Sequence, residues 1–455
     1  MVWLTMFLRC FVLVLVLLLS AGCDNLGFSL PPSTVEATPT NTFVPSPAPP
    51  PTPLPSPDVQ PSPAGPVTLT IWLPPQFDPA SGAESSNLLA ARLEEFSLRR
   101  PGVRLDVRVK ALDGTGGLLD SLTAASAAAP LALPDLIILP RHLMEAAALK
   151  GLLHPLDAFS SSLDNTDWYD YAVELSRLQD TNFGIPLAGD ALLITYRPAV
   201  LVDPPRTWED VLALENPLIF SAADPQALTT LTMYMAAGGP VQDDQGRPML
   251  DAAILTQLLT FYQSAEINQV MPFWLTQYET FDQAWAGYLE NPAALSITWL
   301  SRYLFEETAQ AQEAPLLGED DLIEEDPLAA APLPTPSGAA FTLANGWTLS
   351  LAGAGPSKQA LALELAEFLT ESNFLASWTE AANLLPPRAE IIASWSNDSV
   401  KALVRQVASS AHLIPSSDVL SGLAPHLQQA TLQILKQQAE PVSLAQSTVE
   451  RLVNP

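Results

Sequence analysis

Residues 67–109 read VTLTIWLPPQFDPASGAESSNLLAARLEEFSLRRPGVRLDVRV and hold two strand patterns with a helix pattern between them. Apolar and other side chains alternate in 67–73 and again in 103–109, as in half-buried strands. Between the two strand patterns, apolar side chains recur at helical spacing until Pro101 and Gly102 end the helix. This order predicts a parallel strand–helix–strand unit and therefore an α/β fold.

The same alternation continues along the chain. A further strand is expected at 136–139, and helices are expected at 228–237, 252–263 and 357–370. In parallel α/β sheets, ligands bind beyond the carboxyl ends of the strands. We therefore expect functional side chains just after Leu73 and just after Leu139.

Composition excludes several classes of function. The 455 residues include 20 Lys and Arg against 49 Asp and Glu, a formal net charge of −29. Such a chain is repelled by nucleic acids and by anionic lipid surfaces, so neither is expected as a partner. The two cysteines, Cys10 and Cys23, both lie near the amino terminus, so the rest of the chain can hold neither a disulfide nor a cysteine-based metal site.

The amino terminus has the pattern of a secretory signal. Arg9 is followed by an apolar run that is too short to span a bilayer, and then by small residues before Cys23. This set resembles the bacterial lipobox, which predicts a signal peptide at 1–22 and a lipid on Cys23, although Ser20 stands where leucine is usual. An ordinary cleaved signal and an uncleaved anchor are the alternatives. Residues 23–66 are rich in Pro, Ser and Thr and are expected to form a disordered tether.

From residue 67 onward the chain resembles the family 1 extracellular solute-binding proteins of ABC importers, the maltose-binding-protein-like family. Six segments carry the resemblance, in the family's order: 69–75 (LTIWLPP), 134–159, 183–214 (beginning FGIPLAGDALLITYRP), 235–251, 281–298 and 344–370.

The resemblance implies a two-lobed, hinged periplasmic-binding-protein-like fold of type II, with the ligand held between the lobes. On this basis the first lobe is expected at 67–187 and 340–384, and the second at 188–339 and 385–455. The implied protein is a monomeric extracytoplasmic lipoprotein, anchored to the membrane through Cys23, that delivers a small solute, a carbohydrate above all, to the permease subunits of an ABC importer. A ligand sensor or surface-binding lipoprotein that is not coupled to transport is the alternative.

A sugar site needs aromatic rings for the flat C–H faces and polar groups for the hydroxyl rim. Asp190 is expected to contact the ligand beside the hinge, although a turn-forming aspartate fits as well. Asp224 fits a ligand contact and a cap of the helix at Gln226 equally well. The candidate ligand contacts are Asp190, Asp224, Trp299, Trp347, Arg141 and Gln76. Two aspartates with stacked Trp rings would also suit a cationic ligand such as a polyamine.

Enzyme functions are not supported by the sequence. The four histidines do not have metal-ligand spacing, and the chain holds no Gly-x-Ser-x-Gly elbow and no nucleophilic cysteine. No cofactor and no metal are therefore expected. The acidic segment 318–326 could hold a cation, but its spacing is not that of a calcium loop and favours a solvated loop.

Overall fold

The computed structural model describes residues 66–157, 163, 166–313, 327–353 and 355–453. The predicted signal peptide, Cys23, the tether and the acidic segment 318–326 lie outside the described residues. Ala64–Pro455 forms one compact unit.

The strand–helix–strand prediction is confirmed. Strand β1 (Val67–Leu73) pairs in parallel with β2 (Val103–Val109) along its whole length and with β3 (Leu136–Pro140) on its other edge. Successive side chains of a strand point to opposite faces. Ile71 accordingly packs in one hydrophobic core, and its neighbour Trp72 packs in a smaller core on the other face.

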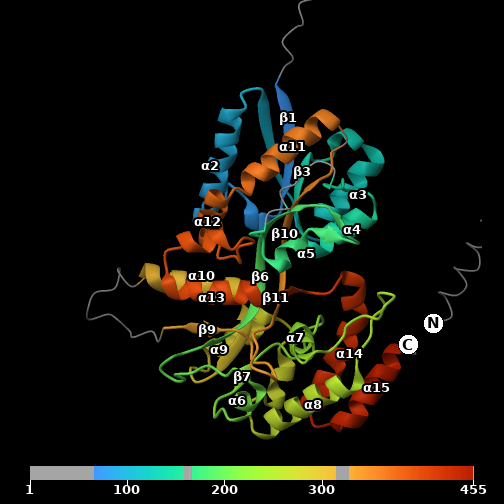
Figure 1. Ribbon diagram of the computed structural model, residues 1–455, viewed down its shortest axis with the longest axis vertical. Helices are drawn as coiled ribbons and strands as arrows, with labels where there is room; N and C mark the ends of the chain where they lie inside the picture. Colours follow the sequence, from blue (N-terminus) through green and yellow to red (C-terminus); the bar gives the residue numbers. More distant parts are fainter. Residues whose placement is uncertain (1–65, 158–162, 164–165, 314–326, 354, 454–455) are drawn as a thin grey trace, which may run out of the picture. The chain divides into compact units, whose positions relative to one another are not determined.

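Helices cover both faces of these strands (Figure 1). They are α2 (Glu84–Arg99), α3 (Leu118–Ala128), α4 (Arg141–Leu149), α11 (Pro356–Leu369) and α12 (Ser372–Ala381). A short helix, α5 (Asp170–Leu175), is followed by a two-stranded ribbon of β4 (Arg177–Leu178) and β5 (Thr181–Asn182).

A second hydrophobic core forms around the later strands. These strands are β7 (Leu218–Ile219), β8 (Leu295–Trp299) and β9 (Ala329–Ala331). The helices around them are α6 (Trp208–Leu212), α7 (Leu228–Ala236), α8 (Ala252–Ile267), α9 (Phe281–Leu289), α14 (Ser417–Leu435) and α15 (Pro441–Val453). The cores on the two faces of β1–β3 belong to one lobe and this separate core belongs to the other, which gives the two lobes that the family resemblance implied.

Long strands run from one core to the other. All residues of β6 (Ile185–Tyr196) are buried; Ile185 packs in the first core and Ile194 in the second. Strand β10 (Thr342–Leu351) lies antiparallel to β6, and β11 (Ala411–Leu413) pairs with β10. In the described residues the strand order is β2-β1-β3-β10-β6-β8-β7, with β11 beside β10 and β9 beside β6.

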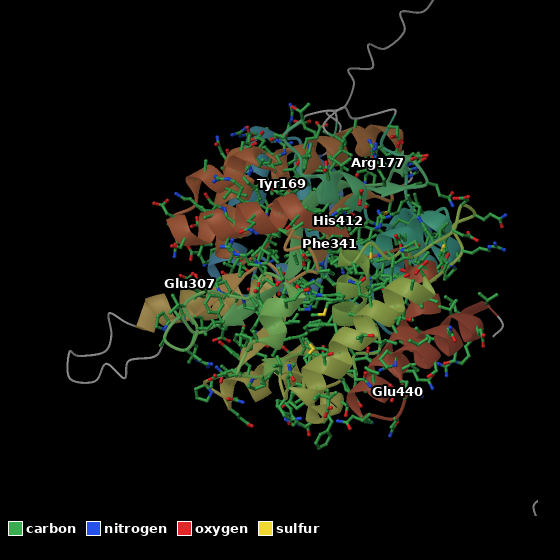
Figure 2. All side chains as sticks on the ribbon, turned by 60° about the horizontal axis from the view of Figure 1, so that its bottom comes forward. Tyr169, Arg177, Glu307, Phe341, His412 and Glu440 are labelled. Atoms are coloured by element: carbon green, nitrogen blue, oxygen red, sulfur yellow. The ribbon has the colours of Figure 1, made fainter. Side chains whose placement is uncertain are left out.

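Aromatic stacking reinforces the pairing of β10 with β11. Phe341, just before β10, stacks on His412 of β11 with ring centroids 4.6 Å apart and planes at 18° (Figure 2). We refer to β6, β10 and β11 as the hinge strands.

The cores divide the chain differently from the sequence-based boundaries. The sequence division assigned 385–455 to the second lobe, whereas α13 (Asp398–Ser410) packs its buried side chains in the first core. Helix α10 (Leu300–Glu313), expected within the second lobe, also packs Leu300 and Leu304 in the first core. A lobe is defined here by where side chains pack. The chain therefore passes from the first lobe to the second for the last time at β11, between α13 and α14.

Among the described residues, every helix is too short or too polar to cross a membrane.

Candidate ligand-binding cleft

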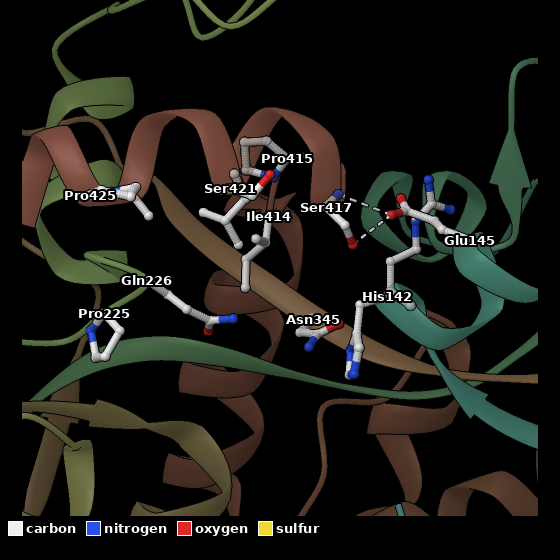
Figure 3. Close-up of a pocket in the computed structure, with 13 residues that line it drawn as sticks. His142, Glu145, Pro225, Gln226, Asn345, Ile414, Pro415, Ser417, Ser421 and Pro425 are labelled. Carbon is white, nitrogen blue, oxygen red and sulfur yellow. Dashed lines mark hydrogen bonds and ion pairs between the residues drawn. The ribbon is translucent and has the colours of Figure 1, made fainter. Parts of the chain in front are cut away.

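A cavity of about 440 Å³ lies where α4, the hinge strand β10 and α14 meet, a volume in the usual range for small-molecule sites (Figure 3). Its walls come from both lobes, because α4 belongs to the first lobe and α14 to the second. The lining residues are Arg141, His142, Glu145, Pro225, Gln226, Asn345, Ile414, Pro415, Ser417, Leu420, Ser421, Ala424 and Pro425.

The first wall is the start of α4, directly after β3, as expected for a site at the carboxyl end of a parallel strand. Arg141 Nε donates to Glu145 Oε1 at 2.7 Å, and Arg141 Nη1 donates to the carbonyl oxygens of Glu174 and Leu175, both at 2.8 Å. These bonds fix the guanidinium against the end of α5. The exposed imidazole of His142 lies beside it on the cavity wall.

Side-chain amides line the middle of the cavity. Asn345 comes from β10, and its Oδ1 accepts the backbone N–H of Gly346 at 2.8 Å. Gln226 is exposed and comes from the loop before α7. An amide both donates and accepts, so these two side chains suit a ligand rimmed with hydroxyl groups.

Asp224 bonds to the backbone at the start of α7, whose N-cap residue is Ala227. Its two carboxylate oxygens accept the backbone N–H groups of Gln226 at 3.0 Å and Leu228 at 2.9 Å, which stabilises the start of α7. Burial raises the pKa of Asp224, while these two hydrogen bonds lower it. Asp224 is buried and is not among the lining residues, whereas Gln226, two positions further on, is.

Asp190 lies in the hinge strand β6, opposite Asn345. Ser301, the second residue of α10, donates to it through its backbone N–H at 3.0 Å and its hydroxyl at 2.5 Å. Burial raises the pKa of Asp190 to about 7, against the lowering effect of the Ser301 bonds. Paired residues of antiparallel strands lie on the same face, so Asp190 continues the row that Asn345 begins.

Trp299 extends this row on β8, because Leu192 of β6 pairs with it. It lines a second cavity of about 310 Å³ together with Phe281, Asp282, Thr298, Ser301, Arg302 and Phe305, and Asp282 is paired there with Arg302 at 2.7 Å. The Trp299 and Phe281 rings are 5.5 Å apart at 55°. The structure thus brings Asp190 and Trp299 onto one face of strands β6 and β8, and neither side chain is part of the lining of the first cavity.

The last two candidates lie elsewhere. Trp347 packs edge-on against Phe77 with centroids 5.5 Å apart, and its buried Nε1 has no hydrogen-bond partner among the described residues. Gln76 is exposed in the short turn Pro75–Phe77 that follows β1. Neither side chain lines the two cavities described above.

Sequence reasoning missed the wall that α14 supplies. Its lining residues are Ser417, Leu420, Ser421, Ala424 and Pro425. The helix was recognisable from the apolar spacing of Val419, Leu423 and Leu427, but nothing in that spacing shows that it faces α4. In the described ranges, no group of three His, Cys, Asp or Glu side chains is placed to hold a metal ion.

Residues 93–404, more than half of the chain, match the family model described as bacterial extracellular solute-binding protein. The chain belongs to this family. Bacterial extracellular solute-binding proteins act outside the cytoplasm and bind solutes, in agreement with a cavity walled by both lobes. No curated protein matches the chain.

Solved structures share the fold of this solute-binding protein. The sugar-binding protein MalE from Xanthomonas citri is 18% identical, with a TM-score of 0.66 over 85% of this chain and 97% of that one. The cyclic α-maltosyl-1,6-maltose binding protein from Arthrobacter globiformis is 16% identical, with a TM-score of 0.66 over 85% and 98%. An ABC transporter solute-binding protein from Thermotoga lettingae, bound with α-D-tagatose, is 18% identical, with a TM-score of 0.61 over 85% and 99%.

Proposed function

We propose that this chain is a lipid-anchored receptor that binds a neutral carbohydrate in the cavity between α4, β10 and α14 and delivers it to an ABC importer. The observation that carries the proposal is that a cavity walled by both lobes occurs in a solute-binding protein. The structural neighbours named above bind maltose-type sugars or tagatose or are described as sugar-binding. In keeping with its family, the chain is proposed to bind its solute without catalysis.

The chemistry of the cavity favours a neutral polyhydroxyl ligand. Amides from Gln226 and Asn345 can exchange hydrogen bonds with sugar hydroxyls. Leucine, isoleucine and proline side chains in the same lining suit the C–H faces of a sugar ring. The rings of Trp299 and Phe281 in the second cavity offer a stacking surface of the kind that sugars use.

The same contacts weigh against a polyamine. A cationic ligand needs carboxylates that are free of other partners, and the one carboxylate lining the cavity, Glu145, is paired with Arg141. The carboxylate of Asp224 accepts hydrogen bonds from two backbone N–H groups, and the carboxylate of Asp190 accepts one from the hydroxyl of Ser301. A neutral ligand therefore fits better than a cation.

A thermal-shift screen of the full chain against mono- and oligosaccharides, polyols and polyamines tests the ligand class. A ligand at about a hundred times its dissociation constant adds roughly 2.7 kcal/mol of stability and raises the melting temperature visibly. We expect a sugar to do so. We expect Gln226→Ala and Asn345→Ala each to weaken the affinity for that sugar about tenfold, the effect of one lost hydrogen bond of about 1.4 kcal/mol.

Gln245→Ala is the matched control, because it removes an exposed amide from a turn outside the cavity lining. A response to polyamines alone would overturn the carbohydrate proposal. A sugar response that neither Gln226→Ala nor Asn345→Ala weakens would place the ligand outside this cavity.

A further inference from the structure

The two lobes are joined across the cavity by a charged contact. Glu145 lies on α4 of the first lobe, and Ser417 is the first residue of α14 of the second. Oε2 of Glu145 accepts both the backbone N–H and the hydroxyl of Ser417, each at 3.1 Å, as the dashed lines in Figure 3 show.

The carboxylate of Glu145 is held for this contact by its own lobe. Glu145 is 4% exposed, and its other oxygen, Oε1, is bound by Arg141. Arg141 is in turn anchored to the carbonyl oxygens of Glu174 and Leu175. One oxygen of Glu145 is thus fixed by the first lobe, and the other is left for α14.

The contact also completes α14. The first N–H groups of a helix have no partner within the helix, and a negative charge at this end is favourable. Ser416, at the N-cap position of α14, makes no side-chain cap hydrogen bond. Glu145 therefore caps from the opposite lobe the helix that carries Ser417, Leu420 and Ser421 into the cavity.

We propose that Glu145 is a positioning residue that holds α14 against α4 and so sets the equilibrium between a closed and an open cleft. We call the Glu145–Ser417 contact the clasp. When the lobes separate, α14 loses its cap, whereas Glu145 keeps Arg141. A ligand that needs the closed cleft would then bind with an apparent affinity reduced by the closed fraction. Only this consequence for affinity rests on the proposed function.

The test measures the distance between the lobes without any ligand. The full chain with Cys10→Ser and Cys23→Ser has no other cysteine, so spin labels can be placed at A124C on α3 and K436C at the end of α14, both exposed positions. Double electron–electron resonance then reports the populations of short and long distances. Because no sugar is present, failure of the ligand screen leaves this test intact.

Ser417→Ala removes the hydroxyl half of the clasp, and Glu145→Ala removes both hydrogen bonds. We expect Ser417→Ala to lower the ratio of short to long distances about tenfold, the usual effect of one hydrogen bond to a charged group, and Glu145→Ala to lower it further. Ser421→Ala is the matched control: this hydroxyl lines the same cavity from the same helix but bonds to Asp418 O within the helix, at 3.0 Å.

Circular dichroism and the melting temperature show whether Glu145→Ala folds, since it leaves Arg141 unpaired. If that variant unfolds, Ser417→Ala still decides. A distance distribution in Ser417→Ala that equals those of the parent chain and of Ser421→Ala would overturn the clasp.

Discussion

At the residue scale, Asp190 is a buried carboxylate in the strand that links the two lobes. It lies on β6 where the chain passes between the two cores, and it holds the second residue of α10 through two hydrogen bonds from Ser301. Its backbone neighbour Ala191 donates a third, at 2.9 Å. Because Asp190 is 9% exposed, desolvation of the charge outweighs these bonds and raises the pKa to about 7.

This raised pKa gives a pH dependence of stability with a definite sign. Between the ordinary value of 3.8 and about 7, the unfolded chain has lost the Asp190 proton while the folded chain keeps it. The contribution of Asp190 to stability is therefore full below pH 4 and is lost as pH rises through about 7. Since one pKa unit corresponds to about 1.4 kcal/mol, the loss between pH 5 and pH 8 is about 2–3 kcal/mol.

Asp190→Asn cannot titrate, so it isolates this effect. Urea unfolding of the wild type and of Asp190→Asn at pH 5 and pH 8 gives the free energy of unfolding of each protein. Between these pH values it should fall by about 2–3 kcal/mol more in the wild type than in Asp190→Asn. Parallel pH profiles for the two proteins would show that the hinge carboxylate does not titrate in this range.

At the scale of elements, the hinge strands β6 and β10 depend on close approach. A Cβ at Gly346 would lie 2.5 Å from the backbone oxygen of Ala188 on β6 and 2.7 Å from a methyl group of Leu175. Across the strand pair, a Cβ at Gly189 would meet the ring of Tyr171 at 2.6 Å. Glycine is needed at these two facing positions because there is no space for a side chain.

Gly346→Ala should therefore force β6 and β10 apart and lower the free energy of unfolding by about 1–3 kcal/mol, the usual cost of overpacking a filled interior. Chemical denaturation measures the loss. Gly102→Ala is the control, because a Cβ there would meet nothing within 4 Å and the backbone needs no positive φ. Equal denaturation midpoints for the two variants would contradict the close-packing argument.

At the scale of the whole molecule, charge limits how the protein can stay at a membrane. A net charge of −29 gives the protein no attraction to an anionic lipid surface. If the protein is held at the membrane, it needs an apolar anchor, either attached lipid chains or the uncleaved apolar run before Cys23, and stable anchoring by lipid requires more than one chain. The proposed lipidation of Cys23, followed by the Pro-rich segment to residue 66, meets this requirement.

Cys23→Ala should move the protein from the membrane fraction to the soluble fraction of its cells and reduce uptake of the sugar that the screen identifies. Immunoblots of the two fractions and uptake of labelled sugar measure both effects. Cys10→Ala, in the apolar run, is the matched control and should change neither. Membrane retention of Cys23→Ala would refute lipidation at that residue, and unchanged uptake would favour the sensor or surface-binding function.

The sequence alone determined the local elements and the class of fold. Apolar spacing located β1, α2 and β2 within a few residues, because side-chain periodicity is a property of neighbouring positions. The order of six segments indicated a two-lobed solute-binding protein, and Arg141, expected near the site because it follows β3, lines the cavity. Asp224 was left open between a ligand contact and a cap; its carboxylate accepts two backbone N–H groups at the start of α7, and a ligand contact stays a prediction.

Only the tertiary structure decided which distant side chains meet. Glu145 and Ser417 are 272 residues apart in the chain, and Asp190 and Ser301 are 111 apart. Their contacts depend on how α4, α14 and α10 pack on the two cores, and periodicity does not encode that packing. The same holds for α13, whose assignment to the first lobe follows from the side chains it buries. Periodicity fixes which face of an element is buried, whereas the partner of that face is chosen by the packing of the whole chain.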